Sequence, residues 1–208
     1  LATALERYAG DYGLSVVGGC CGTTPEHVRA LARAVRGRPV APRTPHPEAA
    51  VASLYSEVQL SQDTSYLSIG ERTNANGSKA FRDAMLAERW DECLDIAKAQ
   101  AREGAHLLDL CIDYVGRDGV RDMRELASRL ATATTLPIVL DSTEPEVLRE
   151  GLEHLAGRCV INSVNFEDGD GPTSRYQRVM ALVREHGAAV VALCIDEEGQ
   201  ARTADWKV

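Results

Sequence analysis

The sequence has no apolar run long enough to cross a membrane. Its longest runs, such as Ala188–Ile195, have the length of a β-strand and fall far short of the roughly 20 residues that a membrane span needs. The first ten residues carry Glu6 and Arg7 and lack an uninterrupted apolar core, so we expect no signal peptide. The chain begins with Leu1 rather than Met, and we expect it to be a piece of a longer protein.

Basic residues are outnumbered, with 23 Lys and Arg against 31 Asp and Glu and a formal net charge of -8. This balance argues against nonspecific binding to nucleic acids or anionic membranes, which requires a basic face. The six cysteines lack the spacing of a disulfide scaffold, which favours a reduced, cytoplasmic compartment. With 44% apolar, 26% charged and 5% aromatic residues, the composition excludes collagen-like, low-complexity and wholly disordered chains.

A short structural unit is predicted before residue 38. The apolar run 14–19, LSVVGG, ends in glycines and predicts a strand. Thr24 and Pro25 are typical of the first positions of a helix, which we expect to run to about Arg36 and to end at Gly37.

A proline-rich stretch separates this unit from the rest. Residues 38–49 hold half of the eight prolines, and proline removes backbone donors and stiffens the chain. We therefore predict a linker over 38–65 that divides the chain into segments 1–37 and 66–208.

After the linker, strand-like runs alternate with helical stretches. Short strand–helix connections predict right-handed crossovers and a parallel sheet. The strands are almost purely apolar, as expected when helices cover both faces or ring a barrel. Because an eight-unit barrel needs roughly 250 residues, we predict an α/β fold of parallel (β/α) barrel pieces: the last unit of one TIM-like barrel and the first five of another. The predicted strands are 66–70, 106–112, 137–141, 158–162 and 188–195, and the helices lie near 79–103, 118–134, 144–155 and 173–186.

Polar residues follow the predicted strands. In parallel sheets and barrels, ligands bind at the carboxyl ends of the strands, so these residues predict one shared pocket. Each residue taken alone could instead cap a helix, but some follow buried strand residues directly. The set comprises Glu71, Arg72, Thr73, Asn74, Asp109, Asp113, Asp141, Ser142, Thr143, Asn162, Ser163 and Asp196.

Cys20 and Cys21 stand together between glycines. Adjacent thiolates can bind one zinc ion if the backbone turns sharply, which Gly18, Gly19 and Gly22 would permit. The alternative is a pair of buried thiols in a glycine-rich turn. A third ligand from His27 is not expected, because that residue lies on the following helix.

At these motifs the sequence resembles cobalamin-dependent methionine synthases. VVGGCCGTTPEHVRAL at 16–31 is similar to the end of that family's homocysteine-binding barrel, and SIGERTNANGSKAF at 68–81 to the opening of its pterin-binding barrel. Three further segments match the pterin-binding domain in order and spacing: 103–113, 137–143 and 151–169.

The resemblance implies roles for individual residues. Cys20 and Cys21 would be zinc ligands, with a third cysteine lying before Leu1. Further pocket residues would lie beyond Val208. The residues that would contact the pterin or its folate tail are Asn74, Asn76, Gly77, Ser78, Asp109, Asp141 and Asn162. Cys111 stands where the family often has Asn, so we expect it either to pack inertly or to leave the amide contact to water.

The implied reaction transfers the methyl group of 5-methyltetrahydrofolate, by way of cobalamin on a domain outside this chain, to zinc-bound homocysteine to give methionine. The chain alone is expected to lack turnover, and the open edges of an incomplete barrel predict self-association. Two alternatives remain: another pterin-binding enzyme, such as a corrinoid-protein methyltransferase or a dihydropteroate synthase-like protein, and a non-catalytic interdomain scaffold.

Overall fold

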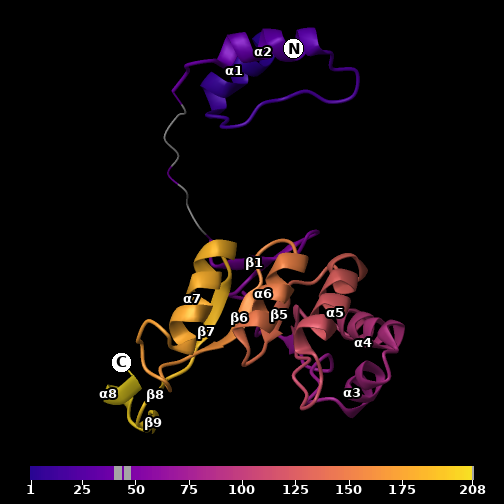
Figure 1. Cartoon of the computed structure of the whole chain (residues 1–208), viewed down its shortest axis with the longest axis vertical. Helices are drawn as coiled ribbons and strands as arrows, with labels where there is room; N and C mark the ends of the chain where they lie inside the picture. The colour runs from indigo at the N-terminus through magenta and orange to yellow at the C-terminus, as the bar shows by residue number, and fades with distance from the viewer. Residues whose placement is uncertain (40–43, 45–47, 208) are drawn as a thin grey trace. The chain divides into compact units, whose positions relative to one another are not determined.

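The computed structural model describes residues 1–39, 44 and 48–207 (Figure 1). The chain divides into two units, Leu1–Pro47 and Glu48–Val208. Residues 40–43 and 45–47 of the predicted proline-rich linker lie outside the described residues.

The first unit is a pair of helices, α1 (Ala2–Tyr12) and α2 (Pro25–Val35). Helix α2 begins as predicted, with a capping box in which Thr24 and His27 satisfy each other's backbone, and Gly37 follows it with φ +72°. The predicted strand at 14–19 is wrong. Those residues pair with no other strand among the described residues, and a strand needs a neighbour for its backbone groups.

The second unit is built on a five-stranded parallel sheet in the order β3-β4-β5-β6-β7. This confirms the predicted α/β arrangement, with sequential strands as neighbours. Within the described residues the sheet remains open and does not close into a barrel. The strands are β3 (Ile69–Gly70), β4 (Leu107–Leu110), β5 (Ile138–Asp141), β6 (Val160–Val164) and β7 (Ala189–Ala192).

Helices connect these strands at nearly the predicted positions. The exception is the long helix expected at 79–103, which is two helices separated by a turn where Glu88 has φ 55°. A non-glycine residue in the left-handed region cannot continue a helix. The helices are α3 (Lys79–Leu86), α4 (Trp90–Arg102), α5 (Gly119–Ala133), α6 (Pro145–His154) and α7 (Arg175–His186).

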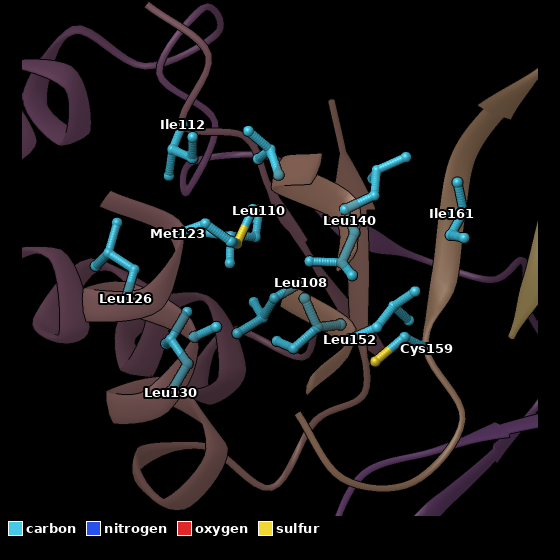
Figure 2. Close-up of a cluster of buried hydrophobic side chains, with 14 of the residues drawn as sticks. Leu108, Leu110, Ile112, Met123, Leu126, Leu130, Leu140, Leu152, Cys159 and Ile161 are labelled. Carbon is cyan, nitrogen blue, oxygen red and sulfur yellow. The ribbon is translucent and has the colours of Figure 1, made fainter. Parts of the chain in front are cut away.

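The two faces of the sheet have different partners. Because side chains alternate along a strand, Leu108 and Leu110 of β4 lie on one face, where they pack in the main core with Leu126 and Leu130 of α5 (Figure 2). The opposite face carries a smaller cluster that contains no helical residue: Val51, Leu107, Val139 and Val160. Helices therefore cover one face of the described sheet, as in the wall of a barrel.

A hairpin that the sequence did not predict contributes to the smaller cluster. Strands β1 (Ala50–Ala52) and β2 (Glu57–Gln59) pair antiparallel, and Val51 is fully buried. Ala52 and Arg158 exchange backbone hydrogen bonds of 3.1 and 2.8 Å. The expected connector therefore belongs in part to the second unit, covering the start of its sheet.

Replacing Gly157 by Ala is expected to destabilise this chain more than the same change at Gly104. Both glycines have positive φ, +88° and +92°, which costs an alanine about 1–2 kcal/mol. A Cβ at Gly157 would lie 2.2 Å from the Ala52 carbonyl oxygen, whereas one at Gly104 would meet nothing within 4 Å. The added clash should cost about 1–3 kcal/mol more. Urea unfolding of both variants checks this, and equal losses would contradict the hairpin contact.

The end of the chain also differs from prediction. The strand expected at 188–195 ends at Ala192, and a separate hairpin follows, β8 (Ile195–Asp196) with β9 (Gly199–Gln200), before helix α8 (Ala204–Lys207). Asp196 lies in β8 and not directly after the fifth parallel strand as expected, and it accepts a hydrogen bond from Trp206 Nε1 at 2.7 Å. Among the described residues, none of the helices is both long and apolar enough to span a membrane.

Candidate functional site

Alternation along the strands brings three predicted polar residues onto one face of the sheet. Asp109, Asp141 and Asn162 each lie two residues beyond a member of the smaller apolar cluster. They therefore share the face without helices, at the carboxyl ends of three neighbouring strands. The register places Asp141 directly opposite Asn162.

Asn74 joins the two aspartates. It lies in the loop after β3, which runs beside the end of β4 because Ala75 N–H donates to the Cys111 carbonyl at 2.9 Å. The Asn74 Nδ2 donates to Asp109 Oδ2 at 2.7 Å and to Asp141 Oδ2 at 2.9 Å. A single amide nitrogen with two hydrogens thus serves both carboxylates, and we call these three residues the carboxylate cluster.

Both carboxylates resist ionisation. Burial raises the pKa of Asp109 to about 6, and the negative charge of Asp141 adds to the shift while the hydrogen bond from Asn74 opposes it. Burial also raises the pKa of Asp141, again against the Asn74 hydrogen bond. Neither carboxylate forms an ion pair with a described residue. A ligand with adjacent N–H donors would supply the missing partners.

A groove of about 340 Å³ opens beside Asp141 and Asn162. Asn162 is half-buried, and its side chain has no hydrogen bond to any other described residue, so the amide is available to a ligand. The groove is lined by Asp141, Ser142, Thr143, Asn162, Ser163, Asn165, Glu167, Asp168 and Arg175.

The turn after Asn74 is held by that residue's other amide atom. Asn74 Oδ1 accepts from the backbone N–H groups of Asn76 and Gly77 at 2.8 and 3.1 Å. Ser78 caps α3 by accepting from Phe81 N–H at 3.3 Å, so its hydroxyl has a structural role. Cys111 is buried, and its sulfur accepts from Asn76 Nδ2 at 3.5 Å. The structure thus brings this predicted turn to the edge of the carboxylate cluster.

Two further residues support the cluster, Thr73 and Gln100, and of these Gln100 was not singled out from the sequence. Thr73 Oγ1 donates to the Asp109 carbonyl at 2.5 Å, and Gln100 Nε2 donates to the same Thr73 oxygen at 3.3 Å. Gln100 is buried on a helical stripe where an apolar residue is usual, and that is the signal that could have identified it. Asp113, which was expected in the pocket, accepts from Ser142 Oγ and Thr143 N–H and ties two loops together. It also lines another cavity, of about 790 Å³, with Asn76 and Thr143.

The two cysteines of the first unit are exposed and adjacent, with sulfurs 3.7 Å apart. A tetrahedral zinc with Zn–S bonds near 2.3 Å places its sulfurs about 3.8 Å apart, so the pair fits half of a zinc site. The turn is closed by Thr23, whose N–H donates to the Cys20 carbonyl at 3.0 Å. No group of three or more His, Cys, Asp or Glu side chains is placed to hold a metal ion within the described residues.

A folded α/β unit with polar groups gathered at its strand ends is typical of a small-molecule binding enzyme. The chain belongs to the pterin-binding enzyme family, whose pattern matches residues 70–208. Residues 1–35 match a second family, homocysteine S-methyltransferase.

Two similar proteins align with both of these regions of the chain. The methionine synthase of Mycobacterium tuberculosis (strain ATCC 25618 / H37Rv) is 66% identical over 208 residues, and that of Mycobacterium leprae (strain TN) is 63% identical over 213. Each alignment covers the whole of this chain, which spans only 17% and 18% of those proteins. The resemblance inferred from the motifs is therefore confirmed.

One solved structure is a looser match. The crystal structure of dihydropteroate synthase (FolP) from Thermus thermophilus is 22% identical, with a TM-score of 0.46 over 75% of this chain and 53% of that one. The assignment to the family rests on the sequence matches alone.

Proposed function

We propose that this chain is part of a methyltransferase that moves the methyl group of 5-methyltetrahydrofolate, by way of cobalamin, to the thiol of homocysteine and forms methionine. Residues 66–208 would form the beginning of the pterin site and residues 1–37 the end of the homocysteine site. The cobalamin-binding domain would lie elsewhere in the same protein, which would act in the cytoplasm.

The carboxylate cluster is the observation that carries the proposal. A pterin presents an aminopyrimidinone edge with adjacent N–H donors, and an aspartate can accept two such bonds. Asp141 lines the groove, and Asn162 opposite it can both donate and accept. Asp109, buried behind Asn74, would form the floor of the pocket. Asn76 and Gly77 would contact the rest of the folate.

Cys20 and Cys21 would contribute two thiolates to a zinc site. When bound, zinc would lower the pKa of the homocysteine thiol so that a thiolate is present at neutral pH. The chain's own part is to hold two sulfurs at a separation that matches tetrahedral geometry, through the turn closed by Thr23.

We predict that this chain by itself binds zinc weakly. Two thiolates fill half of a tetrahedral shell, whereas protein zinc sites use three or four protein ligands. The metal content of the purified chain after dialysis against a mild chelator should fall well below one zinc per chain, as in a C20S/C21S control. Stoichiometric zinc that survives dialysis in the parent chain but not in the control would contradict this.

Of the alternatives, another pterin-binding methyltransferase would lack the first unit, yet that unit matches a homocysteine S-methyltransferase family. The non-catalytic scaffold predicts no folate binding at all.

Separate substitutions in the zinc site and in the pterin site of the full-length protein test the proposal. C20S/C21S should abolish methyl transfer to homocysteine while methyltetrahydrofolate still binds. D141N should weaken folate binding while zinc content is unchanged. If full-length protein with intact residues neither binds methyltetrahydrofolate nor forms methionine, the proposed function is wrong.

A further inference from the structure

Arg175 is the first residue of α7, and its guanidinium binds backbone rather than a carboxylate. Nη2 donates to the Ser142 carbonyl at 2.9 Å, Nε to the Thr143 carbonyl at 2.8 Å and Nη1 to the Ser163 carbonyl at 2.7 Å. One planar cation thus joins the loop that follows β5 to the end of β6.

These contacts lie directly beyond the last paired residues of the two strands. The β5–β6 pairing ends at Asp141 opposite Asn162, and on its other side β6 changes register with β7 between Asn162 and Val164. The next residues, Ser142 and Ser163, are therefore not held together by strand pairing. The guanidinium joins the Ser142 and Ser163 carbonyls where the two strands no longer pair through their backbones.

Stabilising its own helix does not explain Arg175. The first turn of a helix favours negative charge, because the backbone dipole leaves partial positive charge there. The exposed N–H groups are already served, since Asp168 accepts from Arg175 N–H at 2.7 Å and Ser174 caps the helix. The arginine side chain is therefore better explained by what its guanidinium holds.

We propose that Arg175 is a positioning residue of the pterin site, which sets the separation of Asp141 and Asn162 across the groove. This inference rests on the proposed function, because only a ligand that contacts both side chains would sense their separation. Hydrogen bonds from a charged donor are about twice as strong as neutral ones, and a planar group fixes three acceptors in one geometry. A lysine would place one nitrogen among three carbonyls and hold them less rigidly.

The test compares three variants of the full-length protein. R175M keeps the length of the side chain without its donors, R175K keeps the charge without the planar fork, and R178M is the matched control on the same helix. Among the described residues, the Arg178 side chain forms one contact, an exposed one with Glu146 at 3.4 Å. The measurements are Kd and KM for methyltetrahydrofolate, KM for homocysteine and the thermal midpoint.

R175M is expected to raise Kd and KM for methyltetrahydrofolate roughly 10- to 100-fold, the loss expected for charge-assisted hydrogen bonds, with KM for homocysteine unchanged. The Kd and KM of R175K for methyltetrahydrofolate should lie between those of R175M and those of the unsubstituted protein. The values for R178M should equal those of the unsubstituted protein. A lower thermal midpoint in R175M with unchanged folate affinity would overturn the inference and leave a structural role. If R175M does not fold, R175K decides alone: parent-like affinity overturns the inference. Absence of folate binding in the parent protein would refute the proposed function itself.

Discussion

Replacing Asp141 by Ala in the full-length protein is expected to weaken methyltetrahydrofolate binding roughly 30- to 1,000-fold, or about 2–4 kcal/mol. Asp141 ends β5, lines the groove and is half-buried. Its loss would leave two N–H donors of the pterin without acceptors in a site partly shielded from water. Titration of the purified variant with methyltetrahydrofolate measures the effect.

Two controls separate binding from folding. Asp83 lies on α3, where it contacts Lys79 on the surface, and D83A should bind folate as the parent does. D109A removes the buried partner of Asn74, so we expect its first effect to be a lower thermal midpoint and a smaller loss of affinity than in D141A. If D141A binds methyltetrahydrofolate normally, Asp141 does not contact the pterin and serves only to hold Asn74.

Periodicity and the composition of strand ends predict most of the second unit. Five apolar runs with polar endings, alternating with helical stretches, predict parallel strands. The two-residue repeat along a strand then places Asp109, Asp141 and Asn162 on one face of the sheet. The same repeat could not say that Asn74 connects two carboxylates, because that contact depends on a loop from another strand lying beside β4.

The errors have related physical causes. Residues 14–19 look like a strand in isolation, but strand formation depends on a partner elsewhere in the chain. The β1–β2 hairpin is short, and its stability comes from burial of Val51 against the sheet. The break at Glu88 divides an otherwise continuous helical pattern. In the first two cases, the presence or absence of a partner distant in the sequence decides the local structure.

Replacing Asp109 by Asn is expected to stabilise this chain at pH 8 and to leave it nearly unchanged at pH 4. The pKa of Asp109 is raised from 3.8 to about 6 in the folded chain, chiefly by burial. The folded state therefore binds the proton more tightly than the unfolded state. The associated stability is fully present below pH 4 and is lost as the pH rises through 6. One pKa unit corresponds to 1.36 kcal/mol, so the ionised carboxylate costs the folded chain about 3 kcal/mol at pH 8.

An asparagine has nearly the same shape, carries no charge at any pH, and its oxygen can still accept from Asn74 Nδ2. The difference in unfolding free energy between D109N and the parent should grow between pH 4 and pH 7, which urea titrations at several pH values can follow. D83N gives a control of opposite sign, because the hydrogen bond from Lys79 lowers the pKa of the exposed Asp83. The parent chain should then hold an advantage over D83N near neutral pH and lose it in acid. A pH-independent difference between D109N and the parent would mean that the buried carboxylate ionises in the folded chain as it does in water, and that Asn74 and the surrounding backbone compensate for its burial.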